Sequence, residues 1–145
     1  MSGVIAHEWI EPRGGAENVL AAFAKQFPDA PIVCTWDDTH GKFVSGRTCE
    51  SVLAWTPLRK SKVAALPAMA VAWRFPPITR ADWVLCSSHL FAHHIKMADT
   101  PKFVFAHTPA RYLWEPDLDP RGSGLAARAA EIPLRRLDRA RAQEA

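Results

Sequence analysis

One apolar run that ends in polar residues carries most of the information about the fold: Trp83-Val84-Leu85-Cys86-Ser87-Ser88-His89. Its apolar residues do not alternate with polar ones, which is typical of a strand buried on both faces of a parallel sheet. The same pattern occurs at residues 3–7, 32–36 and 103–106. Because no hairpin turn of the Asn-Gly type joins these runs, we predict an α/β domain with a mainly parallel sheet flanked by helices.

Apolar residues at helical spacing lie between and after these runs. Val19, Leu20 and Phe23 predict a helix over residues 16–27, and shorter helices are expected at 66–73 and 90–97. A final helix is expected at 125–144, with its arginines on the solvent side. Residues 37–65 predict no clear element, because glycine, proline and charged residues interrupt them.

Composition limits the class of protein. The chain has 145 residues, of which 48% are apolar and six are tryptophans. This apolar content is too high for a disordered chain. The formal net charge of +3 is carried entirely by residues 121–145, where six arginines face three acidic residues. No apolar run reaches the roughly 18 residues of a membrane-spanning helix, and the N-terminus does not resemble a signal peptide. We therefore expect a soluble, cytoplasmic protein.

Ligand sites in parallel α/β sheets lie beyond the carboxyl ends of the strands. Three segments should meet there: residues 7–15, 87–89 and 107–114. In the first, Gly14 and Gly15 precede a helix, where backbone N–H groups favour an anion such as a phosphate. An ordinary tight turn explains these glycines equally well. The pattern is neither G-x-G-x-x-G nor a Walker loop, so a dinucleotide or ATP site gains little support.

The segment after the last apolar run offers the strongest candidate. His107 follows a buried strand directly, so it is held rigidly and can exchange a proton with a bound hydroxyl. Arg111 offers a planar fork for a phosphate or carboxylate, and Tyr112 and Trp114 offer flat faces for a sugar ring. The alternative is a capped strand end with aromatic side chains that fill the core. For His107 we favour the functional interpretation.

Several other patterns predict no site. His89 and His93 would share one face of a helix, but no acidic residue lies between or just beyond them and no cysteine is near, so we predict no metal. Ser87 and Ser88 are expected in a polar turn rather than as nucleophiles. The three cysteines are too far apart for a disulfide framework or zinc site, so reduced thiols are expected. The arginine-rich end is interpreted as an exposed helical face rather than a nucleic-acid site, and an anionic membrane surface is a weaker alternative.

Taken together, the segments at residues 5–9, 13–17, 87–89 and 107–114 resemble a known family. The elements H-x-W followed by G-G-A-E, and H-T-P-x-R-Y-x-W, are similar to the N-terminal domain of glycosyltransferase family 4 enzymes, which have the GT-B architecture. The resemblance runs in order from the first strand to residue 114.

The resemblance implies retaining transfer of a sugar from a nucleotide-sugar donor to a glycan or lipid-linked acceptor, as in polysaccharide biosynthesis. It implies two Rossmann-like domains, of which the N-terminal one mainly holds the acceptor. Gly14 and Gly15 would approach the donor diphosphate, and His107 would contact the transferred sugar as the catalytic histidine. The further substrate- or donor-binding positions are His7, Glu17, Ser88, His89, Arg111, Tyr112 and Trp114. It implies no cofactor and no metal.

This chain departs from the family pattern in two ways. His93 and His94 stand where many relatives have Lys-Gly, and the paired glutamates that grip the donor are not present in residues 1–145. We therefore expect one Rossmann-like domain over residues 1–145, incomplete at its C-terminal end and inactive without a donor domain or a second chain that supplies one. Whether it acts as an enzyme stays open.

The alternative is a non-catalytic Rossmann-like binding module, and an oxidoreductase is disfavoured because the glycine fingerprint is wrong. Self-association and peripheral contact with the inner face of a membrane are further expectations, whereas no nucleic-acid partner is expected.

Overall fold

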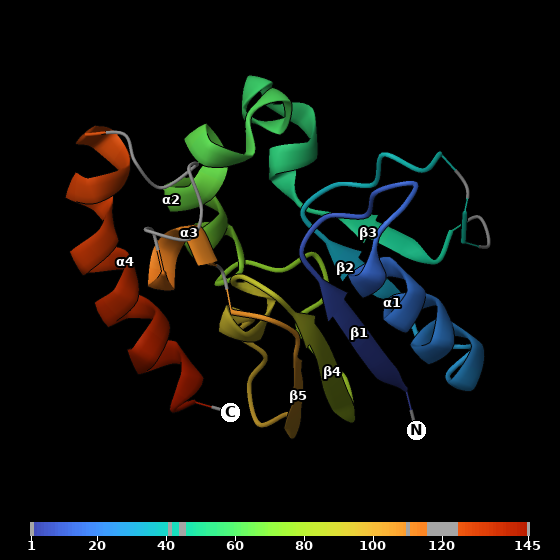
Figure 1. Ribbon diagram of the computed structural model, residues 1–145. Helices are drawn as coiled ribbons and strands as arrows, with labels where there is room; N and C mark the ends of the chain where they lie inside the picture. The colour runs from blue at the N-terminus through green and yellow to red at the C-terminus, as the bar shows by residue number, and fades with distance from the viewer. Residues whose placement is uncertain (1, 41, 44–45, 110, 116–124, 145) are drawn as a thin grey trace.

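A computed structural model describes residues 2–40, 42–43, 46–109, 111–115 and 125–144. Five strands form one sheet in the order β3-β2-β1-β4-β5, and every pair of neighbours is parallel (Figure 1). The α/β prediction is confirmed, and the arrangement is Rossmann-like. The strands are β1 (Gly3–His7), β2 (Ile32–Cys34), β3 (Thr48–Glu50), β4 (Trp83–Ser88) and β5 (Lys102–Ala106).

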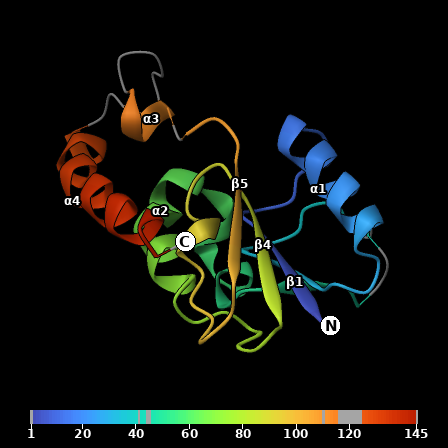
Figure 2. The ribbon, with the colours of Figure 1, turned by 90° about the horizontal axis from the view of Figure 1, so that it is seen from below.

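The helices lie on both faces of this sheet. Figure 2 shows α1 on one side and α2 with α4 on the other. Two buried clusters result, one around Ile5 and Leu20 beneath α1, and one around Trp36 and Met69 on the opposite face. The helices are α1 (Gly15–Gln26), α2 (Lys62–Ala72), α3 (Arg111–Trp114) and α4 (Leu125–Ala142), and the 3-10 turns are η1 (Val52–Trp55), η2 (Pro57–Lys60) and η3 (Ala92–His94).

The short edge strand β3 was not predicted from the sequence. It consists of Thr48, Cys49 and Glu50, all half-buried. Among the described strands, β2 is its only neighbour in the sheet. Such a strand carries no apolar run, so its pattern does not differ from that of a loop. The polar turn predicted at Ser87 and Ser88 is also wrong. Both serines are the last residues of β4, and they pair with Phe105 and Ala106 of β5.

The helix predicted at residues 90–97 is wrong. Only Ala92–His94 form a 3-10 turn. Most of the segment is buried, with Leu90, Phe91 and Ile95 each at most 4% exposed, whereas Lys96 is exposed. The N–H groups of Leu90 and Ala92 donate to the Glu8 carboxylate instead of entering a helical ladder. Tertiary hydrogen bonds thus replace local ones.

The final helix packs against the body of the protein. Leu134 is 9% exposed, and Arg135 donates to the main-chain oxygens of Leu113 and Trp114 at 2.6 and 3.0 Å. These carbonyls lie at the end of α3, where helix carbonyls lack partners within the helix. None of the helices in the described residues is long and apolar enough to cross a membrane. Cys34, Cys49 and Cys86 are free thiols, as expected.

Candidate functional site

The sheet order creates a crevice at the carboxyl ends of β1 and β4. The chain leaves β1 towards β2 on one side and reaches β4 on the other, so the loops that follow these two strands diverge. This is the topological switch point at which parallel α/β sheets bind ligands. The predicted segments that follow β1, β4 and β5 do meet here, because the ring of His89 contacts the rings of both His7 and His107 edge to face.

Ser87 connects two histidines at this edge. Its Oγ lies 3.1 Å from His7 Nδ1 and 2.9 Å from His107 Nε2. His7 Nδ1 also lies 3.1 Å from the Ser87 carbonyl, which can only accept a hydrogen bond, so this nitrogen carries a proton. The Ser87 hydroxyl can then donate to His107 Nε2, which leaves the His107 proton on Nδ1.

Burial governs the charge of this pair of histidines. It lowers the pKa of His7, which is 0% exposed, and that of the partly exposed His107. The positive charge of His89 lowers both pKa values further. Both rings are therefore neutral near pH 7, and a neutral imidazole can donate one hydrogen bond and accept another. His107 is thereby suited to hold a hydroxyl group at the sheet edge.

Glu8 organises the loop after β4. Its fully buried carboxylate accepts hydrogen bonds from the Ser88 hydroxyl and from the N–H groups of His89, Leu90 and Ala92, at 2.8–3.3 Å. His89 Nδ1 lies 3.1 Å from Glu8 Oε2 as an ion pair.

The charges of Glu8 and His89 support each other. Burial alone would raise the pKa of the Glu8 carboxyl, but the charge and hydrogen bond of His89 lower it below its usual range. Burial alone would lower the pKa of His89, and Glu8 raises it. Glu8 was not singled out from the sequence; an acidic residue directly after a buried strand was the available signal.

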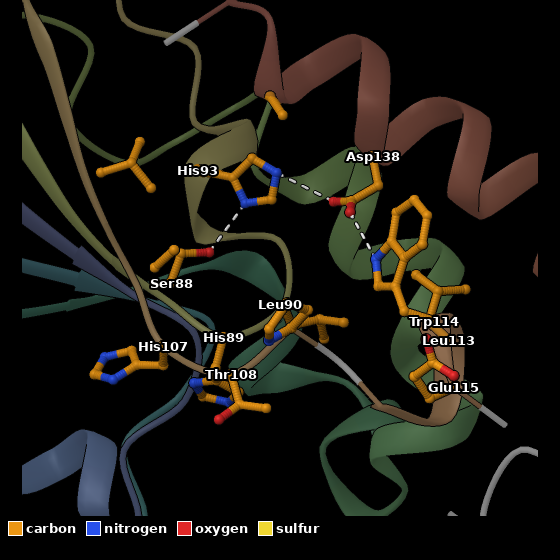
Figure 3. A pocket seen from close by; sticks show the side chains of 14 residues that line it. Ser88, His89, Leu90, His93, His107, Thr108, Leu113, Trp114, Glu115 and Asp138 are labelled. Atoms are coloured by element: carbon orange, nitrogen blue, oxygen red, sulfur yellow. Dashed lines mark hydrogen bonds and ion pairs between the residues drawn. The ribbon is translucent and has the colours of Figure 1, made fainter. Parts of the chain in front are cut away.

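A cavity of about 640 Å³ opens beside this edge, between the ends of β4 and β5 and the helices α3 and α4 (Figure 3). Four of the predicted site residues line it: Ser88, His89, His107 and Trp114. Much of the remaining wall is apolar and comes from Leu90, Val104, Ala106, Pro109, Leu113 and Ala142. A ligand with an apolar body and a few hydroxyl groups matches such a wall.

Gly14 and Gly15, at the start of α1, are not among the residues that line this cavity. A Cβ on Gly14 would collide with the Glu17 carboxylate, whereas a Cβ on Gly15 would meet open space. Glu17 is 3% exposed, and its Oε1 accepts from the Glu11 N–H at 3.2 Å. The carboxylate that the positive start of α1 attracts is thus the chain's own.

The aromatic segment contributes through Trp114. Its Nε1 donates to Asp138 Oδ2 at 3.1 Å, and the guanidinium groups of Arg135 and Arg139 lie 5.5 and 5.1 Å from its ring centre. Trp114 therefore joins the cavity wall to α4. The side chains of Arg111 and Tyr112, two predicted site residues, lie outside the described part of the structure.

The histidines after β4 are not arranged on one helical face. His89 contacts Glu8, while His93 and His94 both contact Asp138 of α4. This last group is the one set of metal-compatible side chains among the described residues. Sequence reasoning missed it because Asp138 lies 44 residues beyond His94.

Comparisons with family models, curated proteins and solved structures returned no match.

Proposed function

We propose that this chain is the acceptor-side domain of a retaining, nucleotide-sugar-dependent glycosyltransferase, with His107 beside the transferred sugar. The nucleotide would be held by a second domain or a second chain, and the acceptor would be a glycan or a lipid-linked sugar. The observation that carries the proposal is the place of His107: it follows β5 at the carboxyl edge, lines the cavity and is oriented by Ser87. The motif resemblance supports the same assignment.

The residues divide the work in this proposal. His107 Nδ1–H donates to a hydroxyl of the transferred sugar near its reacting carbon. The cavity wall, which His107 shares with Trp114 and Leu113, holds the acceptor and excludes water. During transfer the bond from the anomeric carbon to the diphosphate breaks, and a bond to the acceptor oxygen forms on the same face of the sugar. The leaving diphosphate takes the electron pair, and one of its oxygens takes the proton that the acceptor hydroxyl loses.

The test is a binding measurement on the full chain. Isothermal titration with a nucleotide-sugar and with a short-chain lipid-diphosphate sugar should give heat for the second ligand, and His107→Ala should weaken this binding at least tenfold. His40→Asn serves as a control, because His40 is exposed and has a positive φ of 47°, a conformation that Asn tolerates. Transfer should appear when a donor-binding domain is supplied. Equal affinity of the folded His107→Ala variant and the wild type would overturn the proposal.

One observation favours the alternative, a non-catalytic binding module. The Glu17 carboxylate covers Gly14, and a negative charge there opposes a diphosphate. If the module interpretation holds, glycan binding persists, no donor domain produces transfer, and Glu17→Gln leaves the affinity for the nucleotide-sugar unchanged.

A further inference from the structure

We propose that His93, His94 and Asp138 form a binding site for a divalent transition-metal ion of the Zn²⁺ class, open towards the cavity. The proposal does not depend on the function proposed above. It starts from distances: His93 Nε2 and His94 Nε2 lie 3.1 and 2.9 Å from the same atom, Asp138 Oδ1. All three atoms lie within 4.8 Å of one another, and the two imidazole rings are nearly perpendicular, at 89°.

The two separations from Asp138 Oδ1 are close to those of atoms that share one ion. Metal–ligand bonds of about 2.0–2.2 Å place neighbouring ligand atoms roughly 3.0–3.5 Å apart in octahedral or tetrahedral sites. The set of two histidines and one carboxylate suits zinc and, with open positions, iron or cobalt.

The hydrogen bonds around His93 leave a mismatch that a cation resolves. The Ser88 hydroxyl donates its single proton to Glu8 Oε1, at 3.1 Å. It can therefore only accept from His93 Nδ1, 3.0 Å away, so the proton of a neutral His93 is on Nδ1. Its Nε2 then points a lone pair at the Asp138 carboxylate. Either a second proton on His93 or a metal ion must lie between these two acceptors.

The surrounding groups are arranged as supports of a metal site usually are. Trp114 Nε1–H binds Asp138 Oδ2 and leaves Oδ1 free for an ion, and Ser88 fixes the ring of His93 (Figure 3). Such outer hydrogen bonds orient metal ligands. His94 is fully buried and its Nδ1 has no hydrogen-bond partner among the described residues, so His94 would bind the ion through Nε2 alone.

The site would be open rather than closed. His93 and Asp138 both line the 640 Å³ cavity, and their side chains are 12% and 13% exposed. Three protein ligands with a free position towards a cavity are typical of zinc sites that bind water or a substrate oxygen. Two nearby positive charges lower the affinity for a cation. Lys102 donates a hydrogen bond to the His93 carbonyl, and the charge of Arg141 lowers the pKa of His94. We expect micromolar rather than nanomolar binding.

The test uses the full chain after treatment with a chelator. Titration with Zn²⁺ should show one ion per chain. Bound Co²⁺ should give the visible ligand-field bands of a four- or five-coordinate ion. Asp138→Asn and His93→Gln should each weaken binding at least tenfold, and Trp114→Phe should weaken it less. His40→Asn is the matched control, which should bind as the wild type does.

A second measurement covers the case in which a variant fails to fold. In the wild-type chain, Zn²⁺ should slow hydrogen exchange in η3 and α4, because the ion joins these two elements, and should leave α1 unchanged. No Zn²⁺ binding by the folded wild type, or affinity unchanged in Asp138→Asn, would overturn the proposal and assign the contact to a protonated His93 paired with Asp138.

Discussion

At the scale of single residues, the Glu8 carboxylate is the buried charge on which the loop after β4 depends. Glu8→Gln keeps one oxygen that can accept from the N–H groups of the loop, but it removes the negative charge that pairs with His89. We expect Glu8→Gln to lower the free energy of unfolding in urea by about 3–5 kcal/mol. Glu11→Gln is the control: Glu11 is 42% exposed and pairs with Lys62, so the loss should stay below about 1 kcal/mol. Similar losses in both variants would contradict the role of Glu8.

The same ion pair predicts a pH dependence. The pKa of His89 is raised above its reference value of 6.5, so the folded state holds this proton more tightly than the unfolded state. Its stabilising contribution is complete below 6.5 and is lost as the pH rises through the folded-state pKa. The difference in unfolding free energy between the wild type and His89→Gln should therefore be largest near about pH 5 and shrink towards about pH 9. A difference that grows with pH would have the wrong sign.

Gly14 and Gly15 show whether glycine is needed for lack of space or for its backbone conformation. Gly14 has an extended backbone that any residue adopts, so only the collision with Glu17 requires glycine there. Gly14→Ala should cost roughly 1–3 kcal/mol in thermal unfolding, and Gly15→Ala should change stability by less than about 0.5 kcal/mol. Adding Glu17→Ala should remove most of the cost of Gly14→Ala. Additive effects in the double variant would show that the carboxylate is not the obstacle.

At the scale of elements, Arg135 decides how α4 is held. It donates to two carbonyls at the end of α3, whereas its neighbour Arg136 is exposed. Arg135→Gln should speed hydrogen exchange along α4, since charged hydrogen bonds of this kind contribute roughly 1.5–3 kcal/mol. Arg136→Gln removes the same charge and should leave exchange unchanged. Equal effects would indicate that net charge, not the contact, holds the helix.

The elements that were predicted correctly are those whose own sequence pattern specifies them. Helix α1 follows from the spacing of Val19, Leu20 and Phe23, and β1 follows from an unbroken apolar run. The exceptions depend on contacts far away in the chain. The segment around η3 is mostly buried and is bound by Glu8, so no local periodicity predicts it. Strand β3 exists because its backbone pairs with β2.

At the scale of the whole molecule, β5 is an edge strand of the described sheet, and the prediction that residues 103–106 are buried on both faces is wrong, because its apolar side chains face solvent. Phe103 and Phe105 are 58% and 46% exposed. Open edges with apolar residues pair with other chains. Phe103→Lys should therefore lower the self-association measured by sedimentation. Val71→Lys is a matched control on α2, also 58% exposed, and should change it little. An equal decrease in both variants would indicate that exposed apolar side chains in general, and not the edge at β5, cause the self-association.

The candidate site could be predicted only in part for the same reason. The rule that ligands bind beyond parallel strands places His7, His89 and His107 together without any structure. The same rule places Glu8 at this edge, but the roles of Glu8 and Asp138 could not be found this way, because they depend on partners about 80 and 44 residues away. The donor set at Asp138 also needs the exact position of α4, which no pattern in the sequence specifies.

The central place of β1 has a consequence for synthesis in the cell. Residues 3–7 leave the ribosome before β4 does, yet β1 pairs with β4, some 80 residues later, and Glu8 meets its hydrogen-bond donors only when residues up to Ala92 have been made. At translation rates of about 5–20 residues per second, this delay lasts roughly 4–16 s. Throughout that interval one edge of β1 is open, so the nascent chain is the form of this protein most exposed to chaperones and to misassembly.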